Sequence, residues 1–226
     1  MIVLHTTKYS ENSLIIHGYT LEGGRVGTIL RGAVPSGGKR RGSPIKGNSI
    51  SILHPLSIIS AQCTSGRKGG LEILKEYSPK YILPSIRSEI TKSTIALFIS
   101  ELLYRTLLLP EGDESMYQFL ENAILLLERS EGPIANFHIW FLIGYTTKLG
   151  FAPLGDFGSE FDPFSAKQRE VLKKMTDISF IEAMKLPMER EQRGEMIESF
   201  LKYMEFHTGN RIRLNSLAVL KEIFKN

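Results

Sequence analysis

Cysteine is almost absent from this chain, since Cys63 is the only one in 226 residues. A single thiol cannot form an internal disulfide and cannot supply a cysteine-rich zinc site. We therefore expect a reducing compartment and no bound metal. Cys63 lies in an apolar stretch with no base near it in sequence, so it is predicted to be a buried structural thiol and not a nucleophile.

Long apolar runs are also missing. The longest, such as residues 137–145, fall well short of the ~18–20 residues that a membrane span needs. The first residues, Met1-Ile-Val-Leu-His5, have no basic lead and no long apolar region, and so do not resemble a signal peptide. We expect a soluble cytoplasmic protein with no membrane partner.

Motifs of catalysis are lacking too. There is no Walker-type phosphate loop, no G-x-S-x-G elbow and no H-E-x-x-H. Gly66-Arg-Lys-Gly-Gly70 lacks the ending that binds magnesium, and is predicted to be a basic turn leading into a helix. The histidines are widely spaced, which argues against a metal site. We predict no catalytic residue, no cofactor and no enzyme activity.

Charge is unevenly distributed along the chain. Residues 1–85 hold eleven Lys and Arg against four Glu, a net charge of +7, whereas the remainder has a net charge of −3. A basic N-terminal segment followed by a mildly acidic remainder favours contact with a polyanion through residues 1–85. Extra lysines for solubility explain the same numbers about as well.

The pattern of apolar residues changes period near Leu83–Arg87. Before it, runs rich in β-branched residues and Tyr predict short strands. The first two runs are separated by Glu11-Asn12 and the next two by Glu22-Gly23-Gly24, and these short turns indicate a meander and a small barrel. The predicted strands are Ile2–Tyr9, Ser13–Thr20, Arg25–Arg31, Ser49–Leu53 and Leu56–Thr64. After the change, helical spacing predicts an all-helical region with Ile134–Leu149 as its central core helix, a capped start at Ser165 and two terminal helices.

A Gly-, Pro- and Ser-rich segment, residues 32–49, separates the third and fourth predicted strands. It is expected to be a long loop with a basic centre. Lysine and arginine neutralise phosphates through charge density more than through fixed geometry, so such a loop beside a barrel favours binding of a nucleic-acid strand. A solvated loop without a partner is the alternative. Strand rings at His5, Tyr9, His17, Tyr19 and His54 are either stacking platforms or core packing.

Several stretches resemble the RecO family of bacterial recombination mediators. The opening residues 2–17 are similar to the first strands of that family. Gly24-Arg-Val26, Arg31-Gly-Ala33 and His54-Pro-Leu56 resemble later parts of its barrel. In the helical part, residues 95–104, Ala135-Asn-Phe-His138 and Leu149-Gly-Phe-Ala-Pro153 resemble further landmarks. The four-cysteine zinc module that some members carry is absent here.

The resemblance implies an α+β chain, with an N-terminal OB-fold barrel over 1–84 and a helical domain over 85–226. It implies a mediator that binds single- and double-stranded DNA, anneals complementary strands and, with RecR, assists RecA loading in a nucleoid-associated setting. The acidic, apolar tail of the single-stranded-DNA-binding protein would dock on the helical domain. By carry-over the DNA contacts are Arg25, Arg31, Lys39, Arg40, Arg41 and Lys46. For the tail, the candidate residues are Leu102, Leu103 and Arg105. A protein-only adaptor is the alternative function, and an undetected nuclease is a third.

Overall fold

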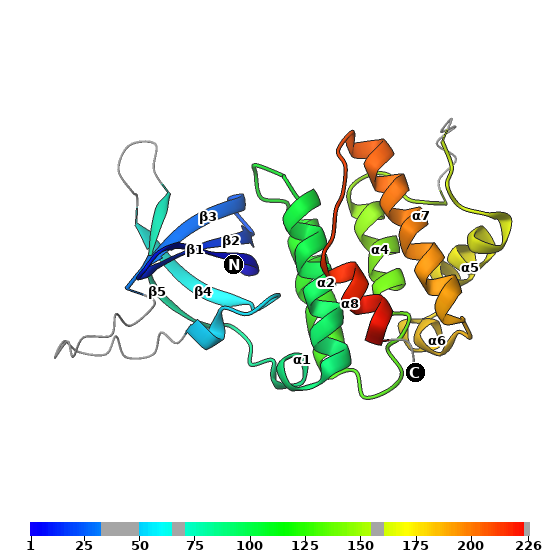
Figure 1. Cartoon of the computed structure of the whole chain (residues 1–226), viewed down its shortest axis with the longest axis horizontal. Helices are drawn as coiled ribbons and strands as arrows, with labels where there is room; N and C mark the ends of the chain where they lie inside the picture. The colour runs from blue at the N-terminus through cyan, green and yellow to red at the C-terminus, as the bar shows by residue number, and fades with distance from the viewer. Residues whose placement is uncertain (33–49, 65–70, 155–160, 224–226) are drawn as a thin grey trace. The chain divides into compact units, whose positions relative to one another are not determined.

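The computed structural model of the chain describes residues 1–32, 50–64, 71–154 and 161–223. Strands come first and helices follow, so the predicted α+β class is confirmed (Figure 1). By its contacts the chain divides into two compact units. The first comprises Met1–Pro84 and Ser100–Tyr117, and the second comprises Ser85–Ile99 and Gln118–Asn226. The expected domain division at residue 84 stays a prediction.

Five strands build the first unit: β1 (Ile2–Ser10), β2 (Ser13–Thr20), β3 (Gly24–Arg31), β4 (Ile59–Thr64) and β5 (Glu72–Pro79). They form one sheet in the order β1-β2-β3-β5-β4. The first three strands are an antiparallel meander, as predicted, because short turns connect them. The β3–β5 pair is parallel, and β4 pairs with β5 antiparallel.

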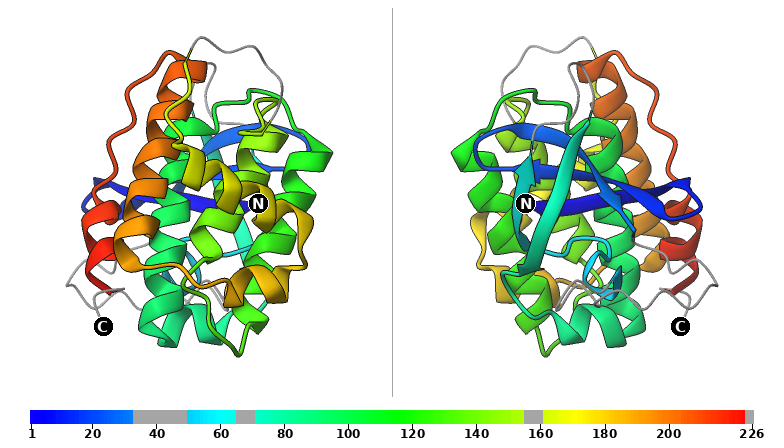
Figure 2. Two further views of the ribbon diagram at one scale, coloured as in Figure 1. Left: turned by 90° about the vertical axis from the view of Figure 1, so that its right-hand side faces the viewer. Right: turned by 90° about the vertical axis from the view of Figure 1, so that its left-hand side faces the viewer.

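The sheet is not closed, which corrects the expectation of a full barrel. Its edges, β1 and β4, approach each other only at one end, where Ile2 and Ile58 form an isolated bridge. The Ile59 amide also donates to the Met1 carbonyl at 2.9 Å. Figure 2 shows how strongly the sheet curls, because β5 runs steeply across β1 in its right-hand view. A five-stranded, partly open barrel is the form that OB-folds take.

One face of this sheet encloses an apolar core. It is formed by Val3, Ile16, Leu30, Leu53, Ile59, Leu74 and Tyr77. Two local predictions are wrong. Ser49–Leu53 is not a strand, because residues Ile50–Ile52 form a 3-10 helix. The residues after Gly70 begin strand β5 and not a helix.

The helices are α1 (Pro84–Ser88), α2 (Ile90–Thr106), α3 (Glu114–Arg129), α4 (Phe137–Lys148), α5 (Ala166–Asp177), α6 (Phe180–Lys185), α7 (Arg190–Thr208) and α8 (Ser216–Ile223). Helix α4 is the core helix of the second unit, as predicted, because eight of its residues are buried. It is followed by Gly150, whose φ of 89° ends the helical path. The capped start at Ser165 is also confirmed, since Ser165 and Gln168 form a capping box.

Candidate nucleic-acid interface

Strand register brings the two histidines of β1 and β2 together on the face of the sheet opposite the apolar core. His5 lies opposite His17, and His17 lies opposite Gly27. Directly opposed residues of an antiparallel pair project to the same side, so these positions share one face. Arg25 belongs to the same face, because it is two residues from Gly27 along β3. Gly27 adds no side chain beside His17, and a Cβ at this position would lie 3.2 Å from the Leu71 side chain and 3.8 Å from the His17 Nδ1.

The last turns of α2 that belong to the first unit place a ring beside these strands. The centre of the Tyr104 ring lies 4.6 Å from that of His5 and 5.1 Å from that of His17. The Arg25 guanidinium carbon stands 4.5 Å from the Tyr104 ring centre, and that of Arg105 stands 5.6 Å from it. We call these five residues, from three strands and one helix, the ring–arginine cluster. Cations within about 6 Å of a ring face are attracted by its quadrupole.

The charge around the ring–arginine cluster is mostly positive. The pKa of His5 is lowered by burial first and then by Arg105 and Arg25, while Glu101 acts in the opposite direction. The pKa of His17 is lowered by burial, by Arg25 and by His5. Neutral imidazoles are therefore favoured while no anion is present. His5 is exposed, and His17 and Tyr104 are half-buried, so the cluster is accessible to solvent.

The backbone beneath Arg25 is held by residues 109–113. The Arg25 amide donates to the Leu109 carbonyl at 2.9 Å, and the Gly112 amide donates to the Glu22 carbonyl at 3.1 Å. Two glycines permit this close approach. A Cβ on Gly24 would lie 2.4 Å from the Glu111 carbonyl oxygen, and one on Gly112 would lie 1.8 Å from the Leu21 carbonyl oxygen. The start of β3, and with it Arg25, is therefore fixed in place.

The predicted DNA contacts lie partly within the described residues. Arg25 belongs to the ring–arginine cluster, and Arg31 is exposed at the end of β3, opposite Ser13. Arg31 lies six positions after Arg25 on the same strand, an even spacing, so both face the same side of the sheet. The remaining predicted contacts, Lys39, Arg40, Arg41 and Lys46, lie outside the described residues.

Sequence reasoning missed Tyr104 and only weakly favoured His5 and His17. Tyr104 had no local signal, because a tyrosine late in a helical pattern is usually core packing. The three residues guessed for the tail differ in exposure. Leu102 and Leu103 are fully buried, whereas Arg105 is exposed in the ring–arginine cluster. Fully buried leucines offer no accessible surface to a binding partner.

The described residues contain no group of three or more His, Cys, Asp or Glu placed to hold a metal ion. None of their helices is long and apolar enough to cross a membrane. The prediction of a buried Cys63 is wrong, because this thiol is exposed on β4, the strand at the edge of the sheet. Its pKa is raised by partial burial and by Glu72, which disfavours the reactive thiolate.

The second unit has an apolar pocket of about 420 Å³ between the end of α3 and α6. Its floor includes Leu126, Phe180 and Met184, and Ile181 is 64% exposed. Arg129 and Lys185 also line this pocket, as does Glu131. We call it the α3–α6 pocket. It combines an apolar floor with two cations, which suits a short apolar peptide that carries negative charge.

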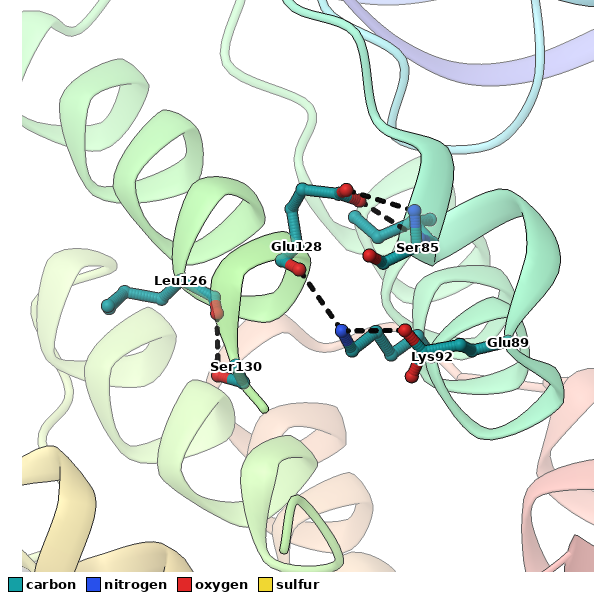
Figure 3. Close-up of polar contacts among 7 residues, drawn as sticks. Ser85, Glu89, Lys92, Leu126, Glu128 and Ser130 are labelled. Atoms are coloured by element: carbon teal, nitrogen blue, oxygen red, sulfur yellow. Dashed lines mark hydrogen bonds and ion pairs between the residues drawn. The ribbon is translucent and has the colours of Figure 1, made fainter. Parts of the chain in front are cut away.

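The end of α3 that forms one wall of this pocket is held by Glu128 (Figure 3). Its carboxylate accepts hydrogen bonds from the Ser85 and Ile86 amides, both at 2.9 Å. These amides lie at the start of α1 and are thereby capped. Lys92 donates to the Glu128 carbonyl at 3.0 Å and to the Glu89 carboxylate at 3.1 Å. The turn that carries Arg129 is fixed by these contacts.

Comparison with known proteins assigns the family. Residues 1–82 match the family described as "Recombination protein O N terminal", and residues 87–160 match "Recombination protein O C terminal". A "DNA repair protein RecO" of Flavobacterium psychrophilum is 30% identical over 240 residues, which cover 99% of this chain and 97% of the relative. Proteins of the same name from Porphyromonas gingivalis and Flavobacterium johnsoniae are 29% and 30% identical over 244 and 238 residues, with the same coverage of both chains. The chain belongs to the RecO family of DNA repair proteins.

Proposed function

We propose that the protein is a recombination mediator that binds DNA through the outer face of its sheet. The observation that carries this proposal is the ring–arginine cluster, in which Arg25 and Arg105 both stand over Tyr104 beside two histidines. Arginine neutralises phosphates, and exposed rings such as that of His5 offer stacking surfaces for unpaired bases. A surface of this kind fits single strands better than a duplex, whose bases are already stacked.

The proposed DNA path continues along β3 to Arg31 and into the basic segment with Lys39, Arg40, Arg41 and Lys46. Residues 25 and 31 are separated by about 20 Å of strand, which corresponds to several nucleotides. Binding of double-stranded DNA, annealing of complementary strands and assistance to RecA loading with RecR extend this proposal on the strength of the family resemblance. Annealing requires no bond chemistry, so we propose a non-enzymatic protein that acts with nucleoid DNA in the cytoplasm.

Titration of a fluorescent single-stranded oligonucleotide at several salt concentrations tests the DNA interface. Replacing Arg25 and Arg105 with alanine is expected to weaken binding, and to flatten the dependence of log affinity on log salt by roughly 0.7 for each phosphate that is no longer neutralised. Replacing Lys39, Arg40 and Arg41 with alanine is expected to act in the same direction.

A double alanine variant of Arg211 and Arg213 is the matched control, because both are exposed arginines of the second unit. It should retain the wild-type salt slope. An unchanged slope in both basic variants would rule out the proposed interface. If the wild-type protein bound no oligonucleotide at low salt, the protein-only adaptor would be the better function. A metal-dependent turnover assay addresses the remaining nuclease alternative.

We further propose that the α3–α6 pocket takes the C-terminal tail of the single-stranded-DNA-binding protein. Support comes from its chemistry, since Arg129 and Lys185 suit the acidic residues of such a tail and the apolar floor suits its side chains. Ile181→Asp places a like charge in the pocket and is expected to weaken binding of a fluorescent tail peptide by at least about tenfold. Val219→Asp is the control, because Val219 is an exposed apolar residue on another helix of the second unit. Equal loss in both variants would count against the pocket.

A further inference from the structure

We propose that binding of a nucleic-acid phosphate at the ring–arginine cluster takes up protons on His5 and His17, so that DNA affinity rises as pH falls. This inference rests on the proposed DNA interface and adds to it a form of regulation. It concerns the phosphodiester, the chemical group that all nucleic acids share.

The close contact between the two imidazole rings explains why a bound phosphate would change their protonation. The imidazole rings of His5 and His17 are stacked, with centres 6.2 Å apart, and both contact Tyr104. Two protonated imidazoles this close repel each other, and a neighbouring guanidinium adds to the repulsion. In the absence of an anion, protonation of this pair is therefore unfavourable. A phosphate placed against the rings reverses the balance, because each added proton then faces a negative charge.

The charged side chains that act on the histidines come from two elements packed against them, β3 and α2. Strand β3 contributes Arg25, and α2 contributes Glu101 and Arg105, each of which acts on the charge state of His5. Among the described residues, two guanidinium groups therefore stand against one carboxylate. The cluster has a local excess of positive charge before either histidine gains a proton, which is the condition for attracting an anion.

The direction of the pH effect follows from these contacts. Burial and the nearby arginines hold the pKa of both histidines below the ordinary value in the free protein. A bound phosphate raises them, so protons are taken up on binding and affinity increases as pH falls through the range where the bound protein titrates. A rise of one pKa unit at one histidine strengthens binding by about tenfold at low pH. Above that range the affinity becomes independent of pH.

The test uses the full chain and fluorescent oligothymidylate, because thymine gains no proton in this range. Affinity is measured at constant ionic strength from pH 5.5 to pH 8. The wild-type protein is expected to bind about tenfold more tightly at the acidic end. The variant with His5→Gln and His17→Gln is expected to lose this dependence. His54→Gln is the matched control, since His54 belongs to the same unit but bonds the Pro55 carbonyl at 3.1 Å and lies outside the cluster.

Three results are distinguishable. A pH dependence that persists in the double glutamine variant, or is absent from the wild-type protein, overturns the inference but leaves the DNA interface standing. No binding at any pH overturns both. Should the double variant fail to fold, the histidine ring resonances of the wild-type protein decide the matter by NMR. Their titration midpoints must move to higher pH when oligothymidylate is added, and unmoved midpoints would contradict the inference.

Discussion

The guanidinium carbon of Arg25 lies 4.5 Å from the centre of the Tyr104 ring, although 79 positions separate the two residues in sequence. The strand residue and the helix residue thus form one surface. The ring attracts the guanidinium by a cation–π interaction and thereby orients the partly buried arginine.

This pairing predicts that Tyr104→Leu weakens binding of single-stranded DNA, although it removes no charge. We expect a loss of roughly 0.5–2 kcal/mol, the range of a cation–π interaction between a guanidinium and a ring. The salt dependence of binding should change little, in contrast to the arginine variants. Tyr104→Phe keeps the ring and serves as the control. If Phe and Leu weakened binding equally, the hydroxyl and not the ring would be responsible.

Two glycines of positive φ give a matched pair for testing the contact between β3 and residues 109–111. Gly24 has a φ of 58°, and an added Cβ would meet the Glu111 and Leu109 carbonyls at 2.4 and 2.5 Å. Gly32 has a φ of 70°, and its added Cβ would meet nothing within 4 Å. Gly32→Ala is expected to cost about 1 kcal/mol of unfolding free energy, the cost of the left-handed conformation.

Gly24→Ala is expected to cost clearly more, because the backbone of two segments must also move apart. Urea denaturation of both variants measures the difference. It would argue against the described contact if the two alanine variants were equally stable.

The hydrogen bonds of Glu128 predict that replacing this residue lowers the free energy of unfolding. Glu128→Gln weakens two hydrogen bonds that the carboxylate accepts from the Ser85 and Ile86 amides. Such charge-assisted bonds contribute about 1.5–3 kcal/mol each when fully formed, so we expect a total loss of about 1–3 kcal/mol in urea denaturation. Glu170→Gln is the control, as Glu170 is exposed on α5. An equal, small effect of both changes would show that the capping contributes nothing.

The burial of His138 predicts that the folded protein loses stability in acid. This side chain is buried in α4, and burial, aided by Arg193, lowers its pKa to about 3. Between about pH 6.5 and pH 3 the unfolded chain therefore binds a proton that the folded chain does not, so stability falls as pH falls through this range. His138→Gln cannot titrate and should show a flatter stability profile between pH 6.5 and pH 4, measured by urea denaturation. A profile with the wild-type slope would assign the acid sensitivity to other groups.

The fold could be predicted where local pattern and final contacts agree. The meander, the apolar helix α4 and the capped start at Ser165 each depend on residues that are close together in sequence, so local patterns predict them. Strand β5 was missed for a definite reason. Leu74 and Tyr77 are both buried at a spacing of three, which looks helical. The ladder shows that Lys75 is an extra residue opposite the Gln62–Cys63 step, and such a bulge shifts the alternation.

The candidate site was less accessible to sequence reasoning. Arg25 and Arg31 were identified from charge and strand pattern, and the histidines from residue type. Tyr104 was not, because its role depends on which part of a long helix meets the outer face of the sheet. The exposure of Cys63 was missed for a related reason. An apolar strand was assumed to be internal, whereas β4 is an edge strand.

The first unit is assembled from two separate stretches of chain, residues 1–84 and 100–117. A protein cut at the apparent boundary near residue 84 would lose both Tyr104 and Arg105. It would also uncover Tyr19, which is fully buried and bonds the Asp113 amide through its hydroxyl at 3.2 Å. The first unit, to which we assign DNA binding as a proposal, is consequently not encoded by one continuous segment that ends at residue 84, and a gene fragment meant to encode it must extend through residue 117.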